Sequence, residues 1–68
     1  MNSCKFIGAW TSGMMSESGS IREQVEKEFN KAWRVADDWL YSVEVAGRKF
    51  FIADNGERGY TAMLPEEY

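Results

Sequence analysis

The chain has 68 residues, a formal net charge of −3 and no histidine. This length predicts one small domain, which buries only about 60% of its unfolded surface and gains about 3–5 kcal/mol from its core. The negative charge argues against general nucleic-acid binding, and the lack of histidine removes the usual general base and the usual zinc ligand.

The first 19 residues predict one weak strand and a loop. Lys5–Trp10 is short and apolar, and we interpret it as a strand that Gly8 weakens. Residues 11–19 are rich in Ser and Gly and predict a flexible connection. No apolar run follows basic residues here, so we expect no signal peptide and a cytoplasmic location. Cys4 is the only cysteine and cannot form an internal disulfide; we expect an incidental small hydrophobic residue and not a nucleophile.

A single helix is predicted from Ser20 to about Ala36. Ser20 and Glu23 match a capping box, and the aspartates at 37 and 38 suit a helix C-terminus poorly. Apolar residues recur at helical spacing and form one stripe, which we expect to cover a sheet. The stripe consists of Ile21, Val25, Phe29, Ala32 or Trp33, and Ala36.

Alternation from Trp39 to Ala53, which places all but two of the bulky apolar residues on one face, predicts a β-hairpin whose turn is Ala46-Gly47. A two-residue turn pairs Val43 with Phe50 and Glu44 with Lys49, so the apolar and the charge patterns agree on one register. A longer turn with a bulge remains an alternative. The residues expected on the core face of the first strand are Trp39, Tyr41, Val43 and Val45.

A third hairpin strand is predicted from about Gly59 to Leu64, where Pro65 ends it. A tight Asn55-Gly56 turn would place Tyr60 on the second face, opposite Phe51. A longer loop through residues 57 and 58 would place Tyr60, Ala62 and Leu64 on the core face. We favour the longer loop because it buries more apolar residues.

These elements predict an α+β domain over residues 1–68, with one α-helix packed on a three- to four-stranded antiparallel sheet in the order β-α-β-β-β. Residues 20–64 hold the helix and the hairpin strands, and residues 65–68 are expected to be a frayed tail. The position of the first strand in the sheet is left open.

Catalytic and metal-binding patterns are not evident in the sequence. The adjacent acids at 37 and 38 and at 66 and 67 do not share a face, and the turn at Asp54-Asn55-Gly56 lacks the alternating ligands of a calcium loop. We therefore expect no enzyme, no cofactor and no small-molecule substrate.

Two surfaces are candidates for binding. One helix covers one face of the sheet, so part of the second face should stay open, unless Phe6, Trp10, Met14 and Met15 fold over it. This surface holds Leu40, Lys49, Phe51, Ala53 and Met63. The other surface, the basic–aromatic cluster, holds Arg48, Lys49, Phe51, Arg58 and Tyr60, unless these residues are only a solvated hairpin end.

From these surfaces we expect a small, non-enzymatic protein-binding module that uses the second face or a sheet edge against a partner or its own copy. Its size alone suggests a phage or mobile-element accessory protein that inhibits or modulates a host protein. The alternatives are single-stranded nucleic-acid binding and a role as a subunit of a larger complex. Membrane binding is not expected. The candidate binding residues are Leu40, Lys49, Phe51, Arg58, Tyr60 and Met63.

Overall fold

The computed structural model describes residues 5–36 and 38–68, with Glu57 described by its backbone alone. The predictions for Cys4 and Asp37 fall outside these residues. The helices and strands are β1 (Ile7–Trp10), α1 (Ser12–Met15), α2 (Gly19–Val35), β2 (Leu40–Val45), β3 (Arg48–Asp54) and β4 (Tyr60–Met63), with short 3₁₀ turns η1 (Gly56–Arg58) and η2 (Pro65–Glu67).

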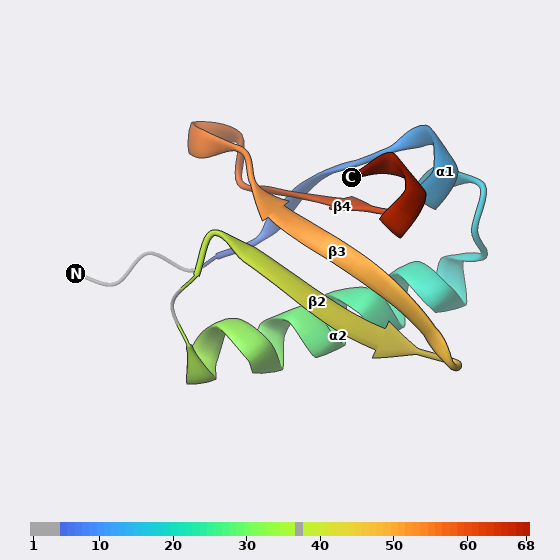
Figure 1. The fold of residues 1–68 in the computed structure, drawn as a ribbon, viewed down its shortest axis with the longest axis horizontal. Coiled ribbons are helices and arrows are strands. Elements are labelled where there is room, and N and C mark those ends of the chain that lie inside the picture. Colours follow the sequence, from blue (N-terminus) through green and yellow to red (C-terminus); the bar gives the residue numbers. More distant parts are fainter. Residues whose placement is uncertain (1–4, 37) are drawn as a thin grey trace.

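The fold is α+β, with the main helix α2 packed on one face of a four-stranded sheet. The strand order is β1-β4-β3-β2, so β1 and β2 form the two edges (Figure 1). The sheet is mixed, because β1 pairs with β4 in parallel while the other pairs are antiparallel. The predicted α+β class, one helix on a small and mainly antiparallel sheet, is confirmed, and the one parallel pair belongs to β1, whose position the sequence left open. The chain reverses direction at α2, β2, β3 and β4 in turn, so β1 runs the same way as both β2 and β4 and cannot pair antiparallel at either edge.

The β2–β3 hairpin has the predicted register. Val43 faces Phe50 and Glu44 faces Lys49. The turn has positive φ at both central residues, 54° at Ala46 and 76° at Gly47, as a two-residue type I′ hairpin turn requires. Tyr41, Val43 and Val45 are buried against α2, as the alternation predicts.

Trp39 does not lie in the core, contrary to the prediction. Its side chain is 61% exposed and it precedes β2. The helix that covers the core face has already ended at Val35, so α2 does not extend over Trp39. The alternation correctly predicted which side chains of β2 share a face. It could not show how far along β2 the helix α2 extends.

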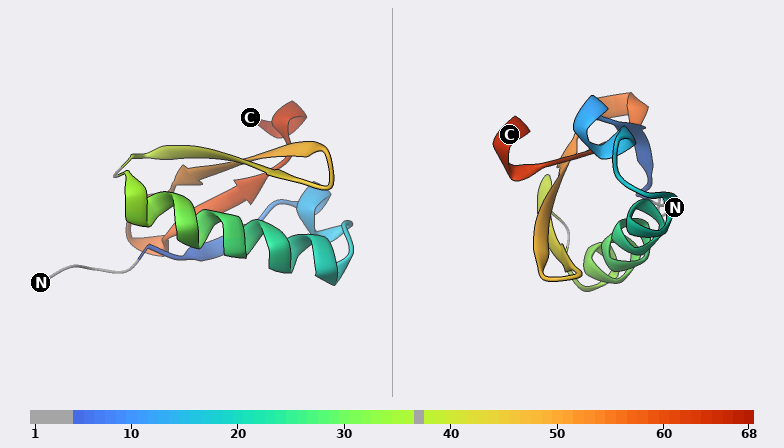
Figure 2. Two further views of the ribbon diagram at one scale, coloured as in Figure 1. Left: turned by 90° about the horizontal axis from the view of Figure 1, so that it is seen from below. Right: turned by 90° about the vertical axis from the view of Figure 1, so that its right-hand side faces the viewer.

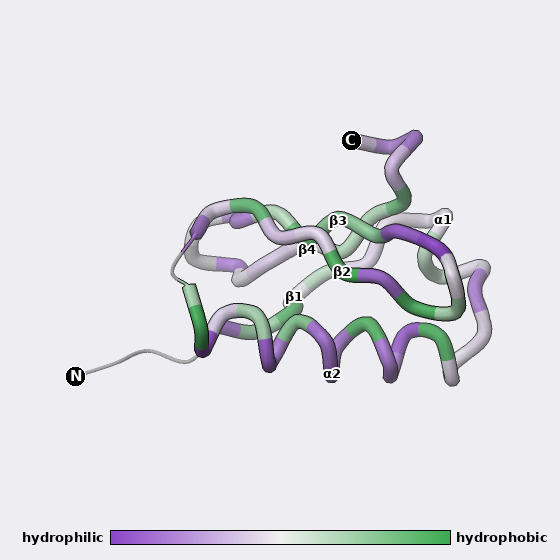
Figure 3. The backbone as a smooth tube through the Cα atoms, turned by 60° about the horizontal axis from the view of Figure 1, so that its bottom comes forward, coloured by the Kyte–Doolittle hydropathy of each residue, from purple (hydrophilic) through white to green (hydrophobic). Residues whose placement is uncertain are grey.

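Helix α2 begins two residues earlier in sequence than the capping box predicts. Ser18, and not Ser20, is the N-cap, and its hydroxyl accepts a hydrogen bond from the backbone N–H of Ile21 at 3.3 Å. Arg22 stabilises this start, because its guanidinium donates to the backbone carbonyls of Met14, Met15 and Glu17. Figure 3 shows the hydrophobic positions of α2 on its sheet side and the hydrophilic positions away from the sheet. The helix ends near Ala36, as predicted.

The segment from Thr11 to Ser18 is ordered, which corrects the prediction of a flexible connection. Thr11 caps α1, and Met14 of α1 is fully buried. The sequence of α1 shows no hydrophobic periodicity, because a single turn of helix is too short for a repeat to be visible. The buried core comprises Met14, Val25, Phe29, Tyr41, Val43, Val45, Phe50, Ile52, Tyr60 and Ala62.

Strand β4 follows the longer of the two predicted loops. The chain passes through η1, and β4 pairs with β3 so that Tyr60 and Ala62 are buried on the core face. Gly59 makes this entry possible, since it has a φ of +86° and lies directly against Phe6: a Cβ at position 59 would lie 2.7 Å from the Phe6 ring.

The C-terminal residues are docked, and the prediction of a frayed tail is wrong. The Glu67 carboxylate accepts hydrogen bonds from the Thr11 hydroxyl, from the Gly13 N–H at 3.2 Å and from the Leu64 N–H at 3.0 Å. These contacts tie η2 to the start of α1. Figure 2 shows η2, in red at the C-terminus, on the side of the sheet away from α2. A composition of two acids and an aromatic gives no local sign of such an anchor.

Candidate functional site

The second face of the sheet is partly covered by η2. The Tyr68 ring lies 5.3 Å from the Phe51 ring, centroid to centroid, with the planes inclined at 50°. Leu40, Ala53 and Met63 are half-buried on this face. The alternative raised from the sequence was a cover made of Phe6, Trp10, Met14 and Met15. In the structure, Met14 lies in the core and Trp10 packs against the core, so the cover is a different one.

The basic–aromatic cluster is not brought together. Tyr60 is buried on the core face, where its hydroxyl donates to the Asp38 carbonyl at 2.6 Å, whereas Phe51 lies on the second face. The alternation of β3 and β4 separates the two rings, so they do not form one aromatic platform. Lys49 is exposed beside Glu44 in the hairpin.

The two arginines of that cluster lie at opposite ends of β3. Arg48 begins the strand and forms a two-pronged ion pair with Glu17, with N–O distances of 2.7 and 2.9 Å. Arg58 belongs to η1, which follows the other end. A seven-residue strand spans roughly 20 Å, so one ligand strand could not use both cations in a compact site.

A different surface, the outer edge of β2, has the features of a binding site. Among the described residues, β2 has one neighbouring strand, β3. The Trp39 carbonyl accepts from the Asp54 N–H at 2.7 Å, which sets the odd-numbered residues as the hydrogen-bonded pairs with β3. The N–H and C=O groups of Leu40, Ser42 and Glu44 therefore point outward, away from the sheet.

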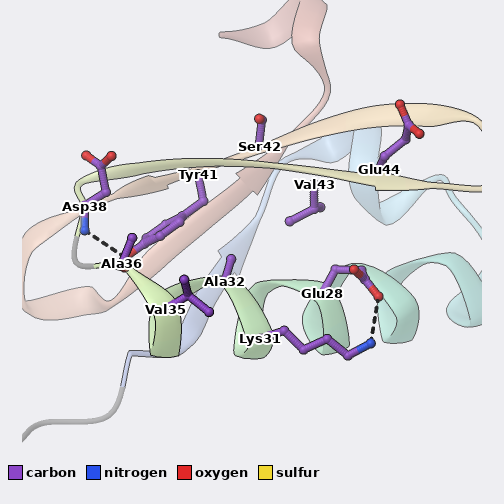
Figure 4. Close-up of a pocket in the computed structure, with 10 residues that line it drawn as sticks. All are labelled: Glu28, Lys31, Ala32, Val35, Ala36, Asp38, Tyr41, Ser42, Val43 and Glu44. Carbon is purple, nitrogen blue, oxygen red and sulfur yellow. Dashed lines mark hydrogen bonds and ion pairs between the residues drawn. The ribbon is translucent and has the colours of Figure 1, made fainter.

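A groove runs between this edge and the C-terminal half of α2, with a volume of about 540 Å³ (Figure 4). Ala32 and Val35 of α2 point toward β2, and Val43 points back toward the helix. Val35, the last residue of α2, is 87% exposed. We call this the edge groove; it is lined by Glu28, Lys31, Ala32, Val35, Ala36, Asp38, Tyr41, Ser42, Val43 and Glu44.

One end of the edge groove is held rigid by Tyr41. Its hydroxyl donates to the Ala36 carbonyl at 2.6 Å and accepts from the Asp38 N–H at 2.8 Å. The ring packs edge-on against Phe29, with centroids 5.4 Å apart. These contacts join the end of α2 to the start of β2 at one end of the groove.

Charged side chains border the edge groove. Lys31 pairs with Glu28 at 3.4 Å. Asp38 lies two residues before β2 and Glu44 lies near the end of the strand, and in Figure 4 their carboxylates point away from α2, on the same side as the Ser42 hydroxyl. The Asp38 carboxylate accepts a hydrogen bond from the Trp39 N–H at 2.8 Å, and Glu44 lies opposite Lys49 of β3. The rim therefore carries charges of both signs.

Among the described residues, the pKa shifts of Glu17, Arg48 and Glu67 arise from contacts outside the edge groove. A hydrogen bond from Arg48 lowers the pKa of Glu17, and the same contact raises the pKa of Arg48. The Thr11 hydroxyl, followed by the Leu64 N–H, lowers the pKa of Glu67. Each shift follows from a contact that holds two segments of the fold together.

Within residues 5–36 and 38–68, no group of three or more potential acidic or cysteine ligands is placed to hold a metal ion. No helix in the described part of the chain is long and apolar enough to cross a membrane.

Of the candidate binding residues, Leu40 alone lies on β2, while Lys49, Phe51, Arg58, Tyr60 and Met63 are distributed over both faces and one end of the sheet. The sequence argument did not single out the groove residues of α2, because nothing local indicates that β2 is an edge strand. Comparison of the chain with known protein families, with curated protein sequences and with solved structures gave no match.

Proposed function

We propose that this protein is a non-enzymatic protein-binding module, which binds a partner by taking an extended segment of it as an additional strand along β2. The observation that carries this proposal is the position of the outward backbone groups of β2 directly beside the edge groove. In strand addition, main-chain hydrogen bonds supply affinity, and pockets for alternate side chains supply specificity.

The edge of β2 supports this role better than the second face does. An edge strand offers unpaired N–H and C=O groups, which natural proteins usually protect with proline, a bulge or a covering segment. The strand Leu40–Val45 has no proline, and its register with β3 is continuous. The second face, in contrast, is partly occupied by the stacking of Tyr68 on Phe51.

The nucleic-acid hypothesis loses its geometric support, because the aromatic rings of the basic–aromatic cluster lie on different faces. Single-strand binding depends on exposed rings on which bases can stack. Tyr60 is only 5% exposed.

The test selects peptides from a random linear library displayed on phage and follows the amide hydrogen exchange of the protein when each peptide binds. We expect slower exchange at Leu40, Ser42 and Glu44, whose N–H groups point outward. Peptides that bind tightly without changing exchange at these amides would overturn the proposal, as would a library that yields no binder.

A substitution at the edge tests the same proposal from the protein side. Ser42→Pro removes an outward N–H and places the ring at the free edge, where proline is tolerated in a sheet. Ser42→Thr is the matched control, because it keeps the N–H and suits a strand. We expect selected peptides to bind Ser42→Thr and to be lost on Ser42→Pro, with circular dichroism confirming that both variants fold. Equal binding to both folded variants would refute strand addition, and the exchange experiment decides the matter should Ser42→Pro unfold.

A further inference from the structure

Resting on the proposed function, we infer that the strand added along β2 is the β2 strand of a second copy of this chain, paired antiparallel about a two-fold axis through Ser42. Three observations carry this inference: the outward backbone groups of β2, the order of the side chains along β2, and the exposed apolar surface of α2 beside the edge groove.

The outward backbone groups of β2 fit this arrangement. A second copy related by a two-fold axis presents the same edge, with its β2 antiparallel to the first. When Ser42 lies opposite Ser42 of the second copy, Leu40 lies opposite Glu44 and Glu44 lies opposite Leu40. All three residues with outward N–H and C=O groups then form hydrogen-bonded pairs.

The neighbouring registers are less favourable. An axis through Tyr41 would set Glu44 opposite Asp38, and two carboxylates directly opposite each other are destabilising. The backbone of Asp38 is also engaged within its own chain, because its N–H donates to the Tyr41 hydroxyl and its carbonyl accepts from the Tyr60 hydroxyl. An axis one residue further along would set Leu40 opposite Ala46, which belongs to the hairpin turn and not to the strand.

The side chains of β2 on the face toward α2 complement one another in the register centred on Ser42. Tyr41 lies opposite Val43 of the second copy, and Trp39, directly before the strand, lies opposite Val45. Pairs of an aromatic and a β-branched residue across neighbouring strands are stabilising. Trp39 is 61% exposed in the single chain, so the second copy gives this side chain a partner that the fold does not supply.

The charges along the edge are compatible with this pairing. Glu44 lies opposite Leu40 of the second copy and opposite Lys49 of its own β3, so no carboxylate is set against another. On the helix wall of the groove, Lys31 pairs with Glu28 at 3.4 Å. Two such walls facing each other bring both signs of charge together and no excess of one sign.

The apolar surface of α2 lies where the second helix would cover it. In Figure 4, Ala32 lies under the middle of β2, between Val35 and Glu28 along the helix. An axis through Ser42 therefore brings the Ala32 side chains of both helices near the axis, and a small residue there allows the close approach of packed helices, at about 8–10 Å between axes. Val35, which is 87% exposed in the single chain, lies beside this contact.

The first measurement is the molar mass in solution, by sedimentation equilibrium from low micromolar to millimolar protein. We expect the mass to rise toward that of two chains, and amide exchange at Leu40, Ser42 and Glu44 to slow as it rises. Ser42→Pro should keep the mass of one chain, whereas Ser42→Thr should dimerise. A protein that keeps the mass of one chain throughout this range would overturn the inference.

Disulfide cross-linking tests the position of the axis, in a Cys4→Ser background that leaves each introduced thiol alone. Ser42→Cys should form a covalent dimer on mild oxidation, because opposed residues of a hydrogen-bonded pair have Cα atoms about 5.5 Å apart, within the range of a disulfide. Glu44→Cys is the matched control, since it is equally exposed on the same face but lies about four residues, or roughly 14 Å, from its own copy. A mixture of Leu40→Cys and Glu44→Cys should cross-link as a heterodimer. Equal cross-linking of Ser42→Cys and Glu44→Cys alone would refute this register.

The helix contact is tested at Val35. Val35→Lys should weaken the dimer at least about tenfold, because it places a charge in the apolar contact, and a lysine suits the C-terminal end of a helix in the single chain. Met15→Lys is the matched control, since Met15 is likewise exposed and the last residue of its helix, but does not line the groove. We expect Met15→Lys to dimerise like the unmodified chain. Equal weakening by both variants would show that net charge and not the groove governs the association.

The outcomes separate this inference from the proposed function, for which peptides are selected on dilute protein in which single chains prevail. If the protein remains monomeric while selected peptides slow exchange at Leu40, Ser42 and Glu44, the second copy is the wrong partner and strand addition stands. If a dimer forms but these amides exchange as fast as before, the copies pair elsewhere and the inference is wrong; the peptide selection then decides the proposed function. If there is neither a dimer nor a peptide that binds, both are refuted.

Discussion

The two adjacent methionines of α1 provide a sharp test of the fold. Met14 has no exposed surface and lies in the core, whereas Met15 is 59% exposed. Both residues belong to the same four-residue helix, so replacing either with alanine has the same effect on helix propensity. The difference between Met14→Ala and Met15→Ala therefore measures burial alone.

The expected loss for Met14→Ala follows from its complete burial. A buried methionine replaced by alanine costs about 2–5 kcal/mol, as lost transfer free energy plus the cavity that remains. In a domain whose core supplies about 3–5 kcal/mol, this is most of the free energy of unfolding. A loss of about 2 kcal/mol lowers the Tm of a domain of this size by about 8–16 °C. For Met15→Ala we expect a change within about 0.5 kcal/mol.

Thermal unfolding followed by far-ultraviolet circular dichroism, with urea titration of the tryptophan fluorescence, measures both variants. Equal Tm values for Met14→Ala and Met15→Ala would refute the placement of α1 against the core. The same result would restore the interpretation of residues 11–19 as a flexible connection.

Two further predictions concern the backbone at Gly59 and the anchor at Glu67. Gly59→Ala should lower the Tm more than Gly47→Ala, because both have positive φ but only position 59 places a Cβ within 2.7 Å of the Phe6 ring; equal losses would show that this crowding is relieved freely. Because its folded-state pKa is depressed, Glu67 stabilises the docked C-terminal turn above its ordinary pKa of 4.5, and this contribution is lost as pH falls through the lower folded-state value. The Gly13 amide resonance should therefore titrate below pH 4.5, and the titration should disappear in Glu67→Gln; a midpoint at or above 4.5 would contradict the anchor.

The parts of the fold that were predictable from sequence are those with a local and repeated signal. Alternation from Tyr41 to Val45, together with the Glu44–Lys49 pair, identified the hairpin and its register. The apolar spacing of Val25 and Phe29 identified the buried side of α2. In both cases, many residues at a fixed period agreed on one arrangement.

The parts that were missed depend on contacts between distant segments. The start of α2 depends on which serine is the N-cap, and Arg22 contacts three carbonyls of the preceding segment there, a pattern with no sequence signature. The anchoring of Glu67 to Thr11 joins residues near the two ends of the chain. The edge groove was missed for the same reason, because it exists only where the strand order leaves β2 at the edge.

The parallel pairing of β1 with β4 has a consequence for the order of folding. The hairpin and the helix preceding it can form from contacts between neighbouring segments, but Ile7 pairs with Tyr60, near the other end of the chain. Closing so large a loop costs entropy before the pairing returns any free energy, and such non-local contacts slow folding. During synthesis, residues 7–10 must therefore wait as an unpaired, partly apolar segment until β4 has left the ribosome. In this period the chain is most exposed to association with other unfolded chains.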